Sequence, residues 1–188
     1  MRYTERFSDE FGATVDGMFT DEPHMSPHRG DSVVWTSNLP GEFEWRSGYS
    51  LLPVLPALFC DMGPQTARFR SDYRHTVADL FATNYMKQLY DFCDEHRLNH
   101  IGHLLCDGER TLGTRCSGDY FQAAQWLHWG GGDYLGSRTW PQTAARGNPL
   151  PSNNVAAVKF AASTAHLMNK PVVMNECFGL GKQWAIDL

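Results

Sequence analysis

The sequence predicts an α/β fold in which parallel strands alternate with helices. Apolar, strand-like runs occupy residues 14–20, 98–105, 133–135 and 171–175, and helix-like segments separate them. This alternation is typical of parallel strands joined by helical crossovers. Four such units amount to half of an eight-unit (β/α)8 TIM barrel, and an open doubly wound sheet is the alternative. Neither a GxGxxG nor a GxxxxGK[ST] motif occurs in the sequence, which disfavours nucleotide binding.

The first part of the chain has weaker patterns. Residues 2–11 are typical of the end of a helix, with Gly12 as its C-terminal stop. After the strand at 14–20, we expect Thr36 or Ser37 to cap a short helix that contains Leu39 and Phe43. The apolar run at 50–59 contains two prolines, so we expect short helical turns there and not a strand.

The clearest helix is predicted for residues 71–96, because apolar residues recur there in steps of three and four, with Ser71 as its N-cap. A second helix is expected at 118–127 and a third from Asn153 or Asn154 to Leu167. The glycine run at 130–132 is interpreted as a flexible turn before the strand at 133–135.

The composition excludes some classes of function. The formal net charge is -5 and no basic run is present, so we expect no nucleic-acid partner. No apolar stretch approaches the length of a membrane span, and the N-terminal residues are too polar for a signal peptide. The five cysteines lack CxxC spacing, which disfavours a closed zinc site or a disulfide framework. Six tryptophans are available to stack on sugar rings.

Two glutamates are predicted to lie at the ends of strands. Glu22 follows the apolar run at 14–20 and precedes Pro23, which cannot continue a central strand. Glu176 follows the strand at 171–175 in the same way. In parallel barrels, catalytic side chains are mounted at this end of the strands. A pair of carboxyl groups is the equipment for glycoside hydrolysis, and their separation distinguishes retaining from inverting enzymes.

Further side chains are candidates for binding a sugar. His103 ends the second predicted strand and is expected to bind a substrate hydroxyl or to orient Glu176, although a satisfied core histidine would explain it equally well. His100 is three residues away, so the two rings are expected on opposite faces, which argues against a shared metal. The other candidate substrate-binding residues are Asp21, Trp35, His128, Asp133, Asn175 and Trp184.

Several motifs together resemble a known family. They are Phe19-Thr20-Asp21-Glu22-Pro23, Trp35-Thr36, Phe43 with Gly48-Tyr49, Leu55-Pro56-Ala57-Leu58, Asp72-Tyr73 with Thr76, Asn84-Tyr85, Cys93-Asp94-Glu95-His96, Gly102-His103-Leu104-Leu105 and Asn175-Glu176-Cys177-Phe178-Gly179. In this order and spacing, they resemble a group of bacterial (β/α)8-barrel glycoside hydrolases. These proteins are related to the α-L-rhamnosidases of family 106 and to the clan A barrels.

The resemblance implies a place in the barrel and a role for each glutamate. Clan A barrels carry the acid/base glutamate at the end of strand four and the nucleophile at the end of strand seven. The four predicted strands would then be strands four to seven, with Glu22 as the general acid and Glu176 as the nucleophile or base. Residues 1–188 would form an incomplete catalytic barrel domain, a fragment of a longer protein. Asp21 stands where clan A barrels commonly have asparagine.

The expected activity is hydrolysis of O-glycosidic bonds in a plant or bacterial polysaccharide or oligosaccharide, of the α-L-rhamnosidase type and without a cofactor or metal. One alternative is a metal-dependent TIM-barrel hydrolase, for which the sequence offers His24, His28, His103, His128 and Asp133 but no His-x-His strand motif. The other alternative is a non-catalytic carbohydrate-binding barrel fragment. The cellular location of the parent protein and its oligomeric state stay open.

Overall fold

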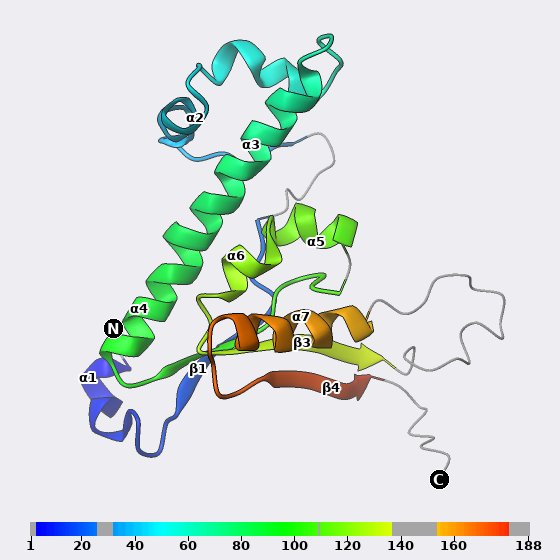
Figure 1. Cartoon of the computed structure of the whole chain (residues 1–188). Helices are drawn as coiled ribbons and strands as arrows, with labels where there is room; N and C mark the ends of the chain where they lie inside the picture. The colour runs from blue at the N-terminus through cyan, green and yellow to red at the C-terminus, as the bar shows by residue number, and fades with distance from the viewer. Residues whose placement is uncertain (1–2, 26–31, 109, 137–153, 181–188) are drawn as a thin grey trace, which may run out of the picture.

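A computed structural model describes residues 3–25, 32–108, 110–136 and 154–180 of the chain. It contains one four-stranded parallel sheet in the order β1-β2-β3-β4 (Figure 1). The strands are β1 (Gly17–Thr20), β2 (Asn99–Gly102), β3 (Trp129–Gly136) and β4 (Met174–Leu180). Strands that follow one another in the chain are neighbours in the sheet. The order therefore lacks the reversal that defines a doubly wound sheet, and the predicted α/β class with parallel strands is confirmed.

The helices extend mainly upward from the sheet in the view of Figure 1. They are α1 (Thr4–Phe7), η1 (Ser8–Glu10), α2 (Leu39–Ser47), η2 (Leu52–Leu58), α3 (Thr66–Phe81), η3 (Ala82–Met86), α4 (Lys87–Glu95), α5 (Arg110–Ser117), α6 (Tyr120–Ala124) and α7 (Asn154–Leu167). The helices α3, η3 and α4 form one continuous rod along the molecule, and α7 lies over β3 (Figure 1). The short helix α6 packs between the rod and α7.

The rod begins at Thr66, so the prediction that Ser71 is its N-cap is wrong. Asp61 fixes the turn before the rod, because its Oδ1 accepts hydrogen bonds of 2.8 Å from both the Gly63 N–H and the Thr66 hydroxyl. The cap predicted at Thr36 or Ser37 is also wrong. Asn38 occupies the N-cap position of α2, and the Thr36 hydroxyl donates to its side-chain oxygen. The helical turns expected at 50–59 are confirmed by η2.

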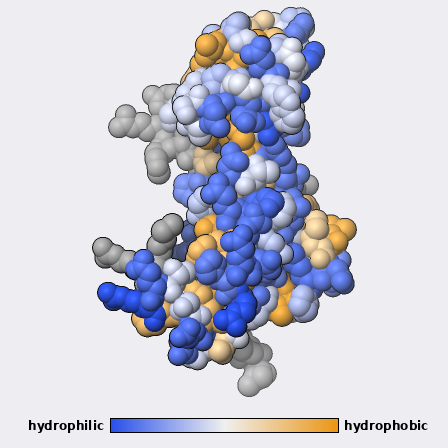
Figure 2. Space-filling model, turned by 90° about the vertical axis from the view of Figure 1, so that its left-hand side faces the viewer, coloured by the Kyte–Doolittle hydropathy of each residue, from blue (hydrophilic) through white to orange (hydrophobic). Residues whose placement is uncertain are grey.

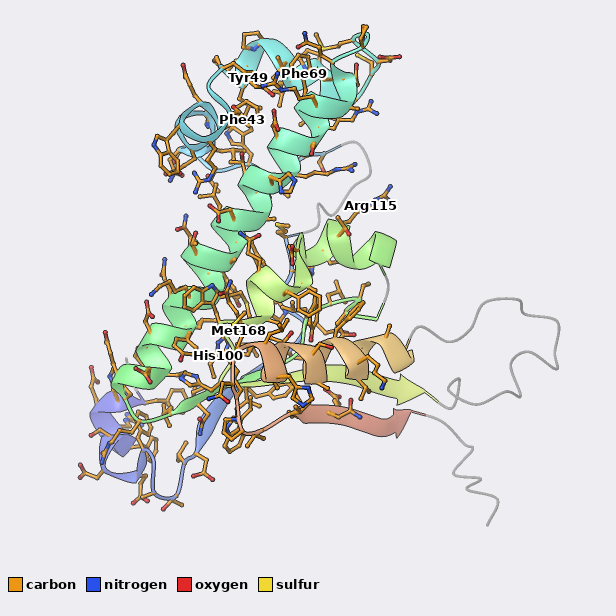
Figure 3. All side chains as sticks on the ribbon, viewed as in Figure 1. Phe43, Tyr49, Phe69, His100, Arg115 and Met168 are labelled. Atoms are coloured by element: carbon orange, nitrogen blue, oxygen red, sulfur yellow. The ribbon has the colours of Figure 1, made fainter. Side chains whose placement is uncertain are left out.

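Apolar side chains bind α2 to the beginning of the rod. Phe43 is fully buried and its ring lies 5.1 Å from that of Tyr49, which in turn lies 5.6 Å from that of Phe69 (Figure 3). A second cluster lies beside the sheet and consists of Met86, Leu104, Ala123, Ala124 and Leu127. Because Leu104 belongs to this cluster, the chain is anchored just after the end of β2, where His103 leaves the strand.

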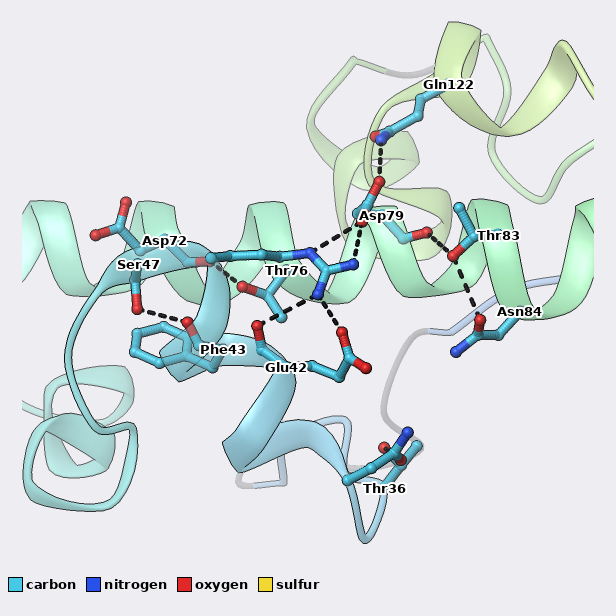
Figure 4. A network of polar contacts seen from close by, with 12 residues as sticks. Thr36, Glu42, Phe43, Ser47, Asp72, Thr76, Asp79, Thr83, Asn84 and Gln122 are labelled. Atoms are coloured by element: carbon cyan, nitrogen blue, oxygen red, sulfur yellow. Dashed lines mark hydrogen bonds and ion pairs between the residues drawn. The ribbon is translucent and has the colours of Figure 1, made fainter.

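A polar network also ties α2, the rod and α6 together (Figure 4). The Arg46 guanidinium binds Glu42 on its own helix and donates from Nε to Asp79 over 2.9 Å. Asp79 also accepts a hydrogen bond of 2.9 Å from Gln122. Arg46, Asp79 and Gln122 are among the residues that line an open depression of about 440 Å³. Its polar atoms largely bind one another, so the depression is part of the helix packing.

The structure corrects two predictions about the last strands. The glycine run at 130–132 lies inside β3 and not in a turn. A Cβ on Gly132 would lie 2.9 Å from the backbone carbon of Ala157, so glycine is needed for the close packing of α7 on β3. The last strand was expected at 171–175, but β4 begins at Met174, and Glu176 lies within the strand instead of at its end. Helix α5 was not predicted.

The face seen from the left of Figure 1 is largely hydrophilic, with apolar patches near its top and in its lower half (Figure 2). The polar face of an amphipathic helix is expected to turn towards water, as the spacing of the rod's apolar residues predicts. Within the described ranges, every helix falls short of the length and apolar character that crossing a bilayer would require.

Candidate active site

The candidate site lies at the carboxyl ends of β1 and β2, beside the middle of β3 and the beginning of β4. Asp21 and Glu22 follow β1, and His103 follows β2. Asp133 in β3 is the direct register partner of Glu176 in β4. Parallel strands present their carboxyl ends at the same edge of a sheet, so residues far apart in the sequence meet there. The structure thus brings together five of the residues that were predicted from the sequence.

His103 is the centre of this group. Its side chain is 1% exposed, and its Nε2 lies 2.8 Å from Glu176 Oε2 and 3.5 Å from Asp21 Oδ1. The Glu176 side chain is 41% exposed and that of Asp21 is 76% exposed. The ring of Phe19 meets the imidazole edge-on at 5.8 Å. A buried imidazole therefore lies behind two carboxylates that remain open to solvent.

Two more carboxylates lie near the same imidazole. Ligand atoms of Glu22, His103 and Asp133 all lie within 4.8 Å of one another, as do those of Asp21, His103 and Glu176. Glu22 has a φ of 46°, a backbone angle that residues other than glycine rarely adopt. Strain of this kind clusters at functional sites. The turn after β1 therefore holds Glu22 in a costly conformation that places its carboxylate in the group.

A close contact between β1 and β2 supports this arrangement. Gly102 has a φ of 153°, and a Cβ there would lie 2.2 Å from the carbonyl oxygen of Thr20. The Thr20 hydroxyl lies 3.0 Å from Nε2 of His100, whose Nδ1 lies 2.9 Å from the Trp126 carbonyl oxygen. Figure 3 marks this second histidine, which is fully buried. His100 and His103 bind different partners, since His103 contacts Glu176, and the prediction that the two rings lie on opposite faces stays a prediction.

Asp107 was not predicted from the sequence. This carboxylate is 6% exposed, and its Oδ2 accepts a hydrogen bond of 3.0 Å from the Asp133 N–H. Burial raises the pKa of Asp107 to about 6, and the charge of Asp133 adds to the effect. The N–H donors of Asp133 and Gly108 and the charge of His103 oppose it. Asp107 lies in a turn behind Cys106, which has a φ of 57°, and no motif marks that turn in the sequence.

The other candidates lie apart from this group or outside the described residues. His128 stacks on Tyr90 at 4.0 Å, and its Nδ1 accepts a hydrogen bond from the His100 N–H. Trp35 is exposed in the segment before α2. Asn175 is exposed in β4 beside Glu176, and Trp184 lies outside the described residues.

Two sets of side chains could hold a divalent cation. Each set combines His103 with two carboxylates, either Asp21 and Glu176 or Glu22 and Asp133. Carboxylate oxygens suit hard cations and imidazole suits softer ones, so the donor set selects no single metal.

The family follows from a direct comparison of the sequence. Residues 2–187 match the family model of glycoside hydrolase family 106, which is described as alpha-L-rhamnosidase. The chain belongs to this family. The family 106 chain is similar to the solved structure of a rhamnosidase from Novosphingobium sp. PP1Y, with a TM-score of 0.66 and 27% identity over 90% of the chain.

A second relative has a different name. The family 106 chain is 27% identical, over 94% of its length, to a protein of Formosa agariphila (strain DSM 15362 / KCTC 12365 / LMG 23005 / KMM 3901 / M-2Alg 35-1) whose name proposes β-glucuronidase activity. The chain spans 13% of that protein and 15% of the Novosphingobium rhamnosidase. Both names describe glycosidases, and the resemblance to glycoside hydrolases expected from the motifs is confirmed.

Proposed function

We propose that this chain carries the catalytic carboxylates of a glycosidase that cleaves α-L-rhamnosidic bonds in plant or bacterial polysaccharides or oligosaccharides. One observation carries the proposal: Glu176, from β4, lies 2.8 Å from the buried His103 imidazole, and a carboxylate oxygen of Glu22, from the turn after β1, lies within 4.8 Å of the same ring. Paired carboxyl groups are what glycoside hydrolysis requires. Membership of family 106 and the similarity to a rhamnosidase support this choice of substrate.

In this proposal Glu22 is the general acid that donates a proton to the glycosidic oxygen as the bond to the sugar carbon breaks. Glu176 either attacks that carbon directly or removes a proton from the attacking water. The hydrogen bond from His103 orients the Glu176 carboxylate. Asp21 and Asn175 are exposed beside these groups and would accept or donate hydrogen bonds to sugar hydroxyls.

We further propose that β1 to β4 correspond to strands four to seven of a (β/α)8 barrel. Their parallel pairing and sequential order are what consecutive barrel strands require. Under this assignment residues 1–188 form an incomplete catalytic barrel domain. The small share of each relative that the chain spans is consistent with that.

The test is hydrolysis of a 4-nitrophenyl α-L-rhamnoside by the chain and by the variants Glu22→Gln and Glu176→Gln. Each variant is expected to lose about 10²–10⁴-fold in rate, as for removal of a general acid or base. Glu44→Gln, an exposed position on α2, is the matched control. The configuration of the released sugar, followed by NMR, distinguishes retention from inversion. Equal rates in all four proteins would refute the roles of the two glutamates.

A second candidate function is metal-dependent hydrolysis, which the grouping of His103 with carboxylates favours. Stoichiometric metal in the purified protein, together with loss of hydrolysis in chelator and recovery on re-addition, would support it. Sugar binding without turnover would instead support a non-catalytic carbohydrate-binding role.

A further inference from the structure

One edge of β3 loses its strand partner near the candidate site. The pairing of β2 with β3 ends at Gly102 and Gly130, whereas β3 continues to Gly136 beside β4. Beyond Gly130, the edge of β3 that faces β2 therefore has backbone groups without a strand to bind them. A buried backbone group without a partner is costly, so other groups must take the place of the strand.

Two side chains do this. The Tyr120 hydroxyl donates to the Gly131 carbonyl over 3.2 Å, and Asp107 Oδ2 accepts from the Asp133 N–H over 3.0 Å. Backbone groups two residues apart on a strand point to the same edge, so both bonds lie on one side of β3. The two side chains thus supply hydrogen bonds to β3 beyond Gly102, where its pairing with β2 ends.

The position of Asp107 connects this edge to the candidate catalytic group. The residue whose N–H it binds, Asp133, is the register partner of Glu176 and belongs with His103 and Glu22. Asp107 is 6% exposed. Its hydrogen bond to the Asp133 N–H is stronger when Asp107 is ionised, because a carboxylate accepts hydrogen bonds more strongly than a neutral acceptor does. A buried carboxylate is costly unless it is paired, and here the Asp133 N–H of β3 is one of its partners.

We propose that Asp107 is a positioning residue: it holds the backbone of β3 at Asp133 and thereby fixes the carboxylates of Asp133 and Glu176 around His103. The inference rests on the proposed glycosidase function for its kinetic consequence. Its structural consequence, the protection of one backbone amide, is independent of that function.

The experiment compares the chain with Asp107→Ala and Asp107→Asn, using hydrolysis of 4-nitrophenyl α-L-rhamnoside and NMR-detected hydrogen exchange. In Asp107→Ala, exchange of the Asp133 amide is expected to accelerate about 10-fold or more, as for loss of a charge-assisted hydrogen bond. The kcat is expected to fall about 100-fold, as for a small misplacement of reacting groups, with little change in KM. Asparagine retains an acceptor oxygen and should restore most of both losses.

Thr164→Val is the matched control, because Thr164 is a buried polar residue whose hydroxyl serves only its own helix, α7. Its Asp133 exchange and kcat should equal those of the unchanged chain. The proposal is overturned if the Asp133 amide stays protected from exchange in Asp107→Ala. It is also overturned if Asp107→Asn loses this protection to the same extent as Asp107→Ala. If the alanine variant does not fold, the asparagine variant decides by keeping or losing that protection. If the unchanged chain hydrolyses nothing, the proposed function fails, and exchange alone decides the inference.

Discussion

The Nε2 atom of His103 lies 2.8 Å from the Oε2 atom of Glu176, although β3 separates the strands from which the two residues come. The imidazole therefore reaches past β3 to a carboxylate on β4, while Asp21, which follows the neighbouring strand β1, lies 3.5 Å away. A carboxylate bonded in this way has a fixed direction, and a catalytic carboxylate must be held in a productive geometry.

His103 is therefore expected to matter for the rate more than for the fold. We predict that His103→Gln lowers kcat about 10²-fold, as for misplacement of a reacting group, and changes KM little. Steady-state kinetics with an aryl α-L-rhamnoside measure both parameters. His75→Gln is the control, because His75 is exposed on α3 and is not one of the residues grouped around His103. Its kcat and KM should equal those of the unchanged chain. A His103→Gln variant with unaltered kcat would contradict the orienting role.

The role of Glu22 can be separated from that of Glu176 by varying the leaving group. A general acid matters less when the departing group is stable as an anion. We therefore predict that Glu22→Gln retains much more of its rate with a 2,4-dinitrophenyl rhamnoside than with a phenyl rhamnoside. Glu176→Gln should be impaired about equally with both. The opposite pattern would exchange the two assignments.

The sequence alone predicted the parallel α/β class, and the acidic residues expected at strand ends include four that lie close to His103 in the structure. Apolar periodicity and strand-end carboxylates are local signals, and Asp21, Glu22, His103, Asp133 and Glu176 all carried one of them. The order of the strands placed these residues together, because consecutive parallel strands end at a common edge.

The remaining features depend on contacts between distant segments. Asp107 was not predicted because its contact with the Asp133 N–H depends on where β2 stops pairing with β3, which no local pattern encodes. The glycine run at 130–132 was taken for a turn because its real reason is the proximity of α7. His128 was included for its residue type, yet it stacks on Tyr90.

Acid should destabilise the protein through His100. Burial is the main cause that lowers the pKa of His100 to about 4, with the charges of His128 and Lys170 adding to it and the Trp126 carbonyl opposing it. Between pH 6.5 and about 4 the unfolded chain binds a proton that the folded protein does not, so stability is lost as the pH falls. The loss for this group is about 3 kcal/mol by pH 4.

Urea denaturation at pH 7 and pH 4.5 measures that loss. In His100→Gln the acid-induced decrease in the free energy of unfolding should be smaller by about 2 kcal/mol, since one protonation site of the unfolded state is gone. His166→Gln, at an exposed position on α7, should show the same decrease as the unchanged chain. An identical pH dependence in all three proteins would show that another group governs acid stability.

Helix α7 packs closely on β3 at Gly132. A Cβ at position 132 would meet the backbone carbon of Ala157 at 2.9 Å and its carbonyl oxygen at 3.1 Å, and a helix backbone cannot yield as a side chain can. We predict that Gly132→Ala lowers the free energy of unfolding by about 1–3 kcal/mol, the usual cost of overpacking a core. Gly41→Ala is the matched control, since Gly41 lies in α2 with no atom within 4 Å of its Cβ position. That change should stabilise the protein by about 0.5–1 kcal/mol through helix propensity. If urea denaturation shows both variants to be stabilised, α7 does not pack on β3 at this distance.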